Sequence, residues 1–517
     1  MKKHFLSVFL LGGLLLSLLW IKIPPKITDV MVDFSQYEQQ EEHTALYTRL
    51  SPDPLWELVP SEDHGAIYPF VGGQRTYLYS TDGTAGVQQK LYGFVDATGQ
   101  ILVDPVYTRA ELLRTDDGTA LPYWRIGKTI YAEEANDSYM LCALASLDGS
   151  FVSPFTYSWF HAYEEYIIAT LPFENRYHIL DHDLNLLLDT KDLSYERIYT
   201  IRYCGEGLFA VCLECPATGD ICLHYVDVSG NVLPGHFQIA YAFTDGWAAV
   251  QLDRDTWTYI DPTGKEMGQY FTECTSFQKG YALVKTEKAS QIIRPDGTVV
   301  LTRNPLPRWS ELTVTSQGLY ISQLGDDPHF YYSFEGELLY EIPHADWLPE
   351  EMIYADYSDL SAPYLYDISQ DRKIPLSPME AGHRLELYTY GDPDAPVIVV
   401  RDRNYATWEA IDSYYSTDYR LLWVSEPYRT GSPATAYLVT EQVGKKAVSY
   451  PVLPNENGLT LYGTTDLALC QYPLSTFTHG RLYDGGYLSL SDDFGTRMYD
   501  PHGTLVFSYR FAIAMED

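Results

Sequence analysis

Basic residues are scarce in this sequence. Its 517 residues include 35 Lys and Arg against 70 Asp and Glu, which gives a formal net charge of −35 at pH 7. A nucleic-acid partner requires a basic surface, because attraction to phosphates supplies most of the binding free energy. We therefore expect no nucleic-acid partner. The acidic residues are scattered and 46% of residues are hydrophobic, so the composition is that of a chain that folds.

Motifs of catalysis and cofactor binding are also missing. The sequence has no Gly-x-Ser-x-Gly, no His-Glu-x-x-His, no phosphate-binding loop and no dinucleotide fingerprint. Asp181, Asp183 and Asn185 match the opening of a calcium loop, but Leu186 replaces the required glycine and Asp192 the final glutamate. We interpret this stretch as a turn. The sequence therefore predicts no catalytic residue, no cofactor and no metal, and it leaves the ligand-binding residues unknown.

Cysteines are few, but four of the seven lie close together, at Cys204, Cys212, Cys215 and Cys222. The favoured interpretation is that they are buried or edge residues of β-strands, because unpaired cysteine is commonly found in cores. Two alternatives stay open. A disulfide between Cys215 and Cys222 would cross a hairpin in an oxidising compartment, and a zinc site would add His224 to the cysteines.

One long apolar run stands at the N-terminus, from Phe5 to Ile23, after Lys2 and Lys3 and broken only by Lys22. A transmembrane helix needs roughly 17–25 apolar residues, and the apolar part of a secretory signal is usually shorter. We expect an uncleaved signal anchor over residues 1–26, with the body outside the cytoplasm. Cleavage and secretion are the alternative.

Helical periodicity is nearly absent after this run, with residues 406–415 as one possible exception. Instead, a pair of glycines recurs. Gly230 and Gly246 are 16 residues apart, as are Gly264 and Gly280. Two offsets that repeat so closely indicate a repeat protein with a unit of roughly 34 residues.

Each unit has a simple physical interpretation. An aromatic or β-branched strand such as residues 257–260 runs into Asp-x-x-Gly, where Asp bonds turn amides and Gly adopts a positive φ. The chain returns as a second strand, and the glycine of Phe-x-x-Gly then turns it into another. Alternating side chains are buried between neighbouring units, which cannot bury them alone.

These residues resemble the WG-repeat (KWG-repeat) family. The best matches are Tyr92 to Asp96 with Gly99, Asp104 to Tyr107, and Phe243 to Val250. The resemblance covers roughly Tyr68 to Ile374 and returns at Leu482 to Tyr509, although later units lose the Trp-Gly pair. It implies a role in binding or scaffolding, without a shared set of catalytic residues.

The predicted fold is all-β. Three- to four-stranded units form a repeat array, for which we favour a β-propeller over a β-solenoid. The predicted parts are an anchor (1–26), a stalk and lead-in segment (27–60), WG-like β-repeats (61–380), divergent β-rich repeats or an insertion (381–470) and a final repeat with possible ring closure (471–517).

The predicted function is binding or scaffolding of an envelope protein or a cell-wall glycan, without catalysis. The alternatives are a propeller-type glycan hydrolase or lyase that uses carboxylates, and a purely structural spacer. Tyrosine is abundant, at 45 residues, and gathers in His329–Phe334, Tyr364–Ser369 and Asp412–Tyr419. These rings are either buried between units or exposed as a surface for glycan or peptide.

Overall fold

The computed structural model describes residues 29–33, 65–78, 86–131, 138–172, 174–193, 195, 198–214, 221–307, 310–323, 328–342, 346–391, 396–429, 437–443, 446–455, 458–461, 471–472, 479–483, 486–492 and 495–512. The predicted anchor, residues 1–26, lies outside these ranges. So does most of the predicted lead-in segment. Among the described residues, no helix has the length and apolar character needed to cross a membrane.

The described residues form β-strands, with one short 3-10 helix, η1 (Thr190–Asp192). The first sheet holds β2 (Ile67–Leu78), β3 (Gly86–Asp96) and β4 (Ile101–Tyr107), and the second holds β5 (Arg109–Arg114), β6 (Ala120–Tyr131) and β7 (Ser138–Ser146). Three sheets follow: β8 (Trp159–Ala162), β9 (Ile167–Thr170), β10 (Tyr177–Leu180) and β11 (Leu186–Asp189); β12 (Ile198–Tyr203), β13 (Leu208–Glu214) and β14 (Ile221–Asp227); β15 (Ile239–Ala240), β16 (Ala248–Asp253) and β17 (Thr256–Ile260).

Three four-stranded sheets come next: β18 (Glu273–Cys274), β19 (Ala282–Lys285), β20 (Ser290–Ile293) and β21 (Val299–Arg303); β22 (Glu311–Val314), β23 (Leu319–Ser322), β24 (His329–Tyr332) and β25 (Leu338–Ile342); β26 (Trp347–Leu348), β27 (Ile353–Asp356), β28 (Tyr364–Asp367) and β29 (Arg372–Pro375). Then follow β30 (His383–Tyr390), β31 (Val397–Asn404), β32 (Glu409–Tyr415), β33 (Leu421–Val424) and β34 (Tyr428–Arg429) in one sheet.

A nine-stranded C-terminal sheet holds β35 (Tyr437–Val443), β36 (Lys446–Asn455), β37 (Gly458–Leu461), β38 (Gln471–Tyr472), β39 (His479–Tyr483), β40 (Tyr487–Asp492), β41 (Gly495–Tyr499) and β42 (Leu505–Ala512), with β1 (Asp29–Asp33) added parallel to β42. The segment 406–415, where the sequence left a helix open, forms a turn and β32 instead. Its strand residues pair with β31, and this pairing overrides the local helical pattern.

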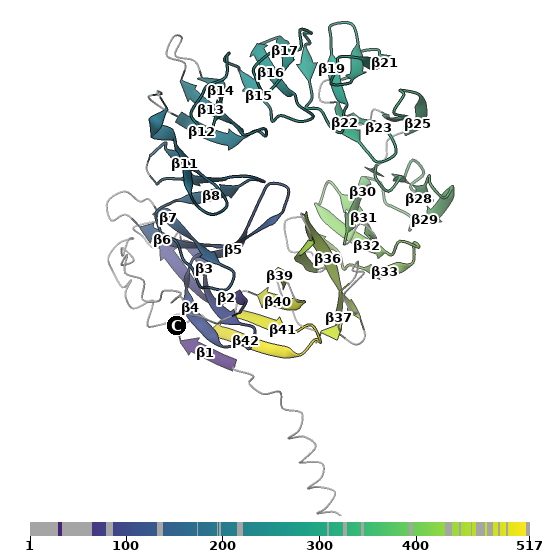
Figure 1. Cartoon of the computed structure of the whole chain (residues 1–517). Coiled ribbons are helices and arrows are strands. Elements are labelled where there is room, and N and C mark those ends of the chain that lie inside the picture. Colours follow the sequence, from purple (N-terminus) through teal and green to yellow (C-terminus); the bar gives the residue numbers. More distant parts are fainter. Residues whose placement is uncertain are drawn as a thin grey trace, which may run out of the picture.

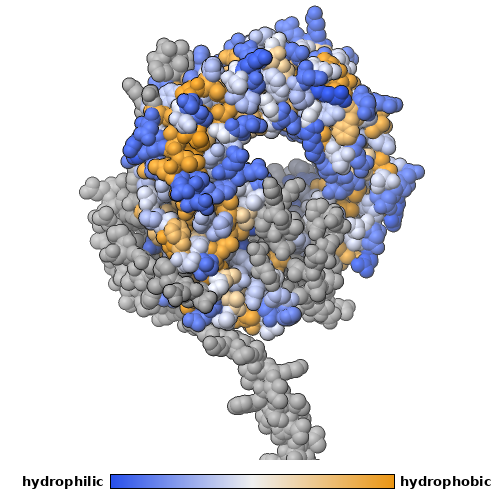
Figure 2. All heavy atoms as spheres, viewed as in Figure 1, coloured by the Kyte–Doolittle hydropathy of each residue, from blue (hydrophilic) through white to orange (hydrophobic). Residues whose placement is uncertain are grey.

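The sheets are arranged in a ring (Figure 1). The first strand of a sheet, such as β8 or β22, lies toward the centre, and the last, such as β11 or β25, lies toward the rim. The space-filling view shows an opening through this ring with a largely hydrophilic margin (Figure 2). The arrangement is all-β and propeller-like.

The outer turns have the residues and the geometry that the sequence predicted. Asp261 Oδ1 accepts hydrogen bonds from the backbone N–H of Thr263 at 2.9 Å and of Lys265 at 3.0 Å, and Gly264 has φ +84°. Where serine replaces aspartate, Ser333 Oγ accepts from two backbone N–H groups at 3.2 Å. Leu184, at the glycine position of its unit, adopts φ +66°. The repeat therefore keeps its turn even where its residues diverge.

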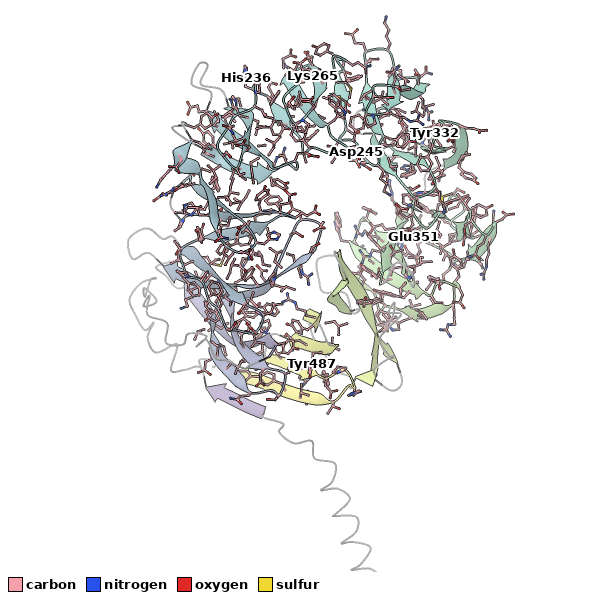
Figure 3. The ribbon with its side chains drawn as sticks, in the orientation of Figure 1. His236, Asp245, Lys265, Tyr332, Glu351 and Tyr487 are labelled. Atoms are coloured by element: carbon pink, nitrogen blue, oxygen red, sulfur yellow. The ribbon has the colours of Figure 1, made fainter. Side chains whose placement is uncertain are left out.

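The turns that join β15 to β16 and β18 to β19 have two-residue loops. In Asp245-Gly246 and Lys279-Gly280, both residues have positive φ, as a type I′ turn requires. These turns also link neighbouring units, because Asp245 Oδ2 accepts a hydrogen bond from the Gly280 N–H at 2.7 Å. Figure 3 places Asp245 at the inner side of the ring.

The ring is closed by packing of the first sheet against the C-terminal sheet. The Phe70 ring lies 5.1 Å from that of Phe507 and 4.8 Å from that of Tyr509, centroid to centroid. The buried Val71 N–H donates to Thr496 Oγ1 at 2.8 Å. An open solenoid would leave both end sheets without such a partner, so this contact favours the propeller-like ring.

The closed ring predicts that substitution of two turn glycines should destabilise the protein to different extents. A Cβ on Gly99, whose φ is +84°, would lie 2.4 Å from the Val506 carbonyl oxygen of the C-terminal sheet, whereas a Cβ on Gly246 meets no atom within 4 Å. We expect Gly246→Ala to lower the free energy of unfolding by about 1 kcal/mol through backbone strain alone. Gly99→Ala should cost roughly 1–3 kcal/mol more, because the contact must also be relieved. Chemical denaturation of both variants measures the difference, and equal losses would contradict this account of closure.

The turn carboxylates make a pH prediction. Hydrogen bonds from Ser146 and Ser150 lower the pKa of Asp148 to about 2. Because the folded pKa lies below the usual value, the stability that Asp148 adds is present above about pH 4 and is lost as the pH falls toward 2. Asp148→Asn keeps an acceptor oxygen without the charge. The unfolding temperature, measured from pH 7 to pH 2, should therefore fall less steeply with pH in this variant than in the unaltered chain. An equally steep fall in both proteins would contradict the prediction.

Candidate functional site

A cavity of about 570 Å³ lies where the first sheet, the second sheet and the C-terminal sheet meet. We call it the junction cavity. Its lining comes from β2 and β3, from β5 and the residue before it, and from β39 and β40: Pro69, Val71, Lys90, Tyr92, Thr108, Arg109, Ala110, Glu111, Arg114, Gly480, Arg481, Tyr483, Ser489 and Ser491. This volume falls in the range of small-molecule sites.

The position of the cavity follows from the repeat. In the four-stranded sheets, the outer turn joins the third and fourth strands, as Gly297 does between β20 and β21. In the first sheet the equivalent Gly99 lies between β3 and β4, so β2 corresponds to a second strand. Within the described residues, this sheet has no inner strand. The cavity lies beside β2, between the strands β5 and β39.

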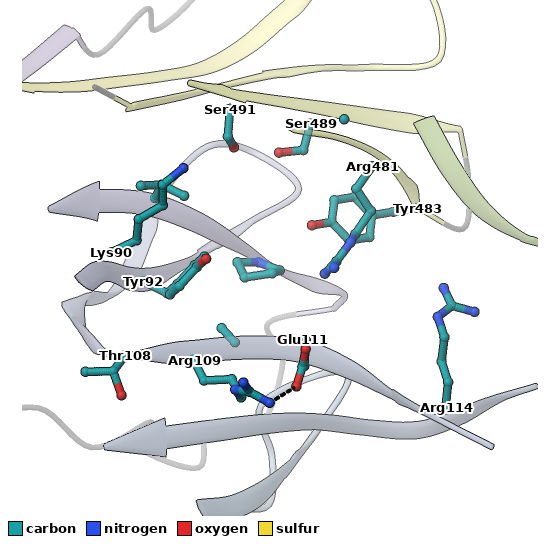
Figure 4. A pocket seen from close by; sticks show the side chains of 14 residues that line it. Lys90, Tyr92, Thr108, Arg109, Glu111, Arg114, Arg481, Tyr483, Ser489 and Ser491 are labelled. Carbon is teal, nitrogen blue, oxygen red and sulfur yellow. Dashed lines mark hydrogen bonds and ion pairs between the residues drawn. The ribbon is translucent and has the colours of Figure 1, made fainter. Parts of the chain in front are cut away.

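The cavity is cationic. Among the described lining residues, four side chains are basic, those of Lys90, Arg109, Arg114 and Arg481, and one is a carboxylate, that of Glu111 (Figure 4). In the whole chain, acidic residues outnumber basic residues two to one. The described lining of the cavity has the opposite composition, with more basic than acidic side chains.

The single carboxylate is already neutralised. Glu111 accepts hydrogen bonds from Arg109 Nη1 at 2.9 Å and from Arg125 Nε at 2.8 Å. Both guanidinium groups also lie over the Trp159 ring, at 4.4 Å and 3.8 Å from its centroid. This stacking holds the two arginines in place at a low entropic cost. Arg481 forms no ion pair with any residue that the structure describes.

Two tyrosines contribute neutral donors. Burial raises the pKa of the Tyr92 hydroxyl, although the positive charges of Arg481 and Arg109 oppose this shift. Burial likewise raises the pKa of Tyr483. Both hydroxyl groups therefore carry their proton at neutral pH, and that of Tyr483 interacts with the side chains of Arg481 and Ser489.

A smaller recess of about 80 Å³ adjoins the junction cavity and shares Arg114, Arg481 and Tyr483 with it. Trp124 also lines this recess and is only 3% exposed. Its indole N–H is buried and has no acceptor in the described part of the chain. An unsatisfied buried donor costs free energy.

The arrangement suits binding of an anion. Guanidinium groups bind carboxylates and phosphates through paired, charge-assisted hydrogen bonds. Tyrosine and serine hydroxyls add neutral partners around them. Hydrolysis of a glycoside usually needs two free carboxylates, whereas Glu111 is the cavity's one carboxylate and is held in ion pairs.

Residues singled out from the sequence lie elsewhere. Asp181 Oδ1 accepts from the Asn185 N–H at 2.8 Å, which is the bond of a repeat turn, as we had interpreted this stretch. Among the described residues, no group of three or more His, Cys, Asp or Glu side chains is placed to hold a metal ion. Cys204 and Cys222 are buried and Cys212 is half-buried, while Cys215, on which the disulfide alternative depends, lies outside the described residues.

The first and last of the tyrosine-rich stretches mainly supply core, whereas Tyr364 and Tyr366 of the middle stretch are half-buried. Tyr331 and Tyr332 in the first stretch are buried, and Tyr414 and Tyr419 in the last are buried too. Their rings pack between strands and sheets, so these positions do not form an exposed aromatic surface. Inner carboxylates such as Glu350 bond neighbouring turns, since its Oε2 accepts from the Ser316 N–H at 3.0 Å. Figure 3 places the adjacent Glu351 near the opening.

Comparison with known proteins supports the repeat that the turns indicate. The family model of the WG containing repeat matches residues 92–117, which include six of the cavity residues, and residues 257–288. No curated protein matches the sequence. Similar solved structures include BamB from Moraxella catarrhalis (10% identity, TM-score 0.31, covering 57% of this chain and 90% of that one) and apo AztD from Citrobacter koseri (12%, 0.27, 70% and 97%). Hsv2 from Kluyveromyces lactis is also similar, with 12% identity and a TM-score of 0.29 over 52% of this chain and 96% of that one. All three TM-scores are too low to support more than a general likeness. Two segments of the chain, residues 92–117 and 257–288, thus match the WG containing repeat.

Proposed function

We propose that this chain is a β-propeller that binds an anionic partner of the cell envelope in the junction cavity. The observation that carries the proposal is the excess of basic side chains in one cavity of a strongly acidic chain. The sheets around an opening and the packing of first sheet on last support a closed propeller. The WG repeats supply the scaffold that brings the cavity together.

The envelope is the proposed location because of the N-terminal run from Phe5 to Ile23. A helix over residues 1–26 would anchor the chain and place its body outside the cytoplasm. The partner is then a protein or a cell-wall glycan that carries negative charge. This extends the role in binding or scaffolding that the repeat family implies.

Catalysis is less well supported than binding. A glycan hydrolase of the usual kind needs a proton donor and a second carboxylate within reach of one bond. The cavity's carboxylate is Glu111, and the guanidinium groups of Arg109 and Arg125 hold it. A retained, unchanged ligand is therefore the expected outcome of incubation with a glycan.

Removal of one cation tests the proposal. Arg481→Gln in the full chain should weaken binding of tetragalacturonate or of an octaglutamate peptide about tenfold, because a charge-assisted hydrogen bond is lost. Isothermal titration calorimetry in detergent solution measures the dissociation constants. Binding by the unaltered chain should also weaken as salt rises from roughly 50 to 500 mM, since added ions screen the cavity's charges.

Arg254→Gln is the matched control. Arg254 is exposed in the turn between β16 and β17, and its substitution removes the same charge from the chain as Arg481→Gln does. Its effect should stay within about twofold. Equal losses in both variants would indicate a general charge effect and contradict the assignment of the cavity. Failure of the unaltered chain to bind either probe would contradict the proposed function.

The anchor makes a separate prediction. The full chain should stay in the membrane pellet after alkaline carbonate extraction, because an apolar helix is held by burial in the bilayer. Protease added to intact cells stripped of their wall should digest the body. Recovery of the protein from the medium with a shortened N-terminus would instead indicate secretion.

A further inference from the structure

We propose that the turn between β31 and β32 binds sugar, with the exposed rings of Tyr405 and Trp408 stacked on an uncharged pyranose unit of a glycan. We call residues 405–408 the aromatic turn. It connects the last residue of β31, Asn404, to the first of β32, Glu409. Its sheet is separate from the three sheets that line the junction cavity (Figure 1). This second site goes beyond the proposed function and does not depend on it.

Trp408 adopts a backbone conformation that disfavours a bulky side chain. Its φ is +61°, in the left-handed region where glycine and asparagine are favoured. Among the described residues, three other large apolar residues have a positive φ, Leu184, Met352 and Tyr419. Met352 and Tyr419 are 5% and 8% exposed, and Leu184 packs against a core cluster, so burial offsets their strain. Trp408 is 55% exposed, and burial therefore does not account for a tryptophan at this position.

The aromatic turn is held in one conformation. Asn404 Oδ1 accepts hydrogen bonds from two backbone N–H groups of the turn, at 2.9 Å and 3.1 Å. The Asn404 carbonyl accepts another from the Trp408 N–H at 2.8 Å. The hydroxyl of Tyr405 donates to Glu386 Oε1, also at 2.8 Å. A ligand that binds here does not have to order the rings first, which lowers the cost of binding.

The two rings are presented together at the surface. Tyr405 is 43% exposed, and its ring centroid lies 6.0 Å from that of Trp408, with 50° between the ring planes. The guanidinium groups of Arg384 and Arg403 each lie 5.6 Å from the Tyr405 centroid and help to fix this ring. A pyranose ring has C–H groups on its faces, and these are attracted to the negative face of an aromatic ring. The pair of rings therefore suits a sugar.

The charges beside the rings cancel one another. Arg403 Nη1 lies 2.9 Å from Glu386 Oε1, and His383 Nδ1 lies 2.7 Å from Asp402 Oδ1. A strongly charged partner gains little from such a surface, because electrostatic complementarity requires an excess of one sign. The aromatic turn differs in this respect from the junction cavity, and it favours an uncharged ligand.

The size of the aromatic turn argues against a protein partner. A stable protein interface buries about 800 Å² on each side around an apolar centre. In β31, β32 and the turn between them, Tyr405 and Trp408 are the exposed large apolar residues. Thr407 and Glu409 flank Trp408 and are exposed, so they can exchange hydrogen bonds with sugar hydroxyls. One or two sugar units fit this arrangement of rings and polar groups.

Uncharged oligosaccharides test the site with the full chain in detergent solution. The probes are cellohexaose, laminarihexaose, maltohexaose and N-acetylchitohexaose, with a decaproline peptide as an uncharged chain without sugar. Isothermal titration calorimetry should give a dissociation constant of roughly 0.1–1 mM for at least one hexaose, as expected for contact with one or two rings. Decaproline should bind at least about tenfold more weakly.

Two substitutions in the aromatic turn separate binding from folding. Trp408→Asn removes the ring and keeps a residue that tolerates a positive φ, so binding should weaken at least about tenfold. The unfolding temperature should stay within about 2 °C of that of the unaltered chain, because relief of strain offsets the lost contacts. Tyr405→Phe keeps the ring and should bind within about twofold.

Leu421→Asn is the matched control, because Leu421 is an apolar residue of the same sheet and is 51% exposed. This variant and Arg481→Gln should each bind the hexaose within about twofold of the unaltered chain. A loss in Arg481→Gln equal to that in Trp408→Asn would place the sugar in the junction cavity and overturn the inference.

Three further results would overturn it. One is that no hexaose binds, and another is that decaproline binds as tightly as the best hexaose, which would make the turn a peptide site. The third is a fall of more than about 5 °C in the unfolding temperature of Trp408→Asn, which would show that the ring supports the fold. The proposed function is tested with anionic probes and would stand in each case.

Discussion

The whole structure depends on one constraint, which is that no sheet can bury its apolar side chains alone. Most sheets have three or four short strands, and the sheets pack against their neighbours in the ring. Tyrosines reinforce the contact, since Tyr225 Oη donates to the Tyr241 carbonyl and Tyr259 Oη to that of Thr275 at 2.7 Å. The end sheets face the same requirement, and Phe70 meets it by packing against Phe507. The ring thus closes for the same reason that neighbouring sheets pack together, which is burial of apolar side chains between them.

A single binding site in such a ring has to come from a break in the repetition. Equivalent positions recur around the ring, so a group on a regular unit has counterparts on the others. The junction of the first sheet with the C-terminal sheet supplies such a break, because it joins the two ends of the array. Charged side chains can occupy the junction cavity, as Arg481 and Arg109 do, because it is open to water and to a ligand.

The sequence predicted the regular part of this structure because turns are local. Asp261 and Gly264 specify their turn within five residues, and the same pattern recurs often enough to predict the all-β repeat. The WG resemblance has the same local origin. The cavity has no such signature. Lys90, Arg109 and Arg481 are separated by up to 391 positions and converge only when the ring closes. The scarcity of basic residues was the available signal, but it does not indicate which of them meet.

The overall charge gives the cavity its selectivity. A net charge of −35 repels anions at long range, whereas the cations of the cavity attract them only nearby. At physiological ionic strength the screening length is about 8 Å, so the distant acidic surface is largely screened and the nearby cations dominate. A ligand with one negative charge gains one contact against the residual repulsion. A ligand with several charges along its length gains several contacts while it is held at one place. Under the proposed function, the cationic cavity of this acidic ring would therefore hold a polyanion more tightly than a small anion.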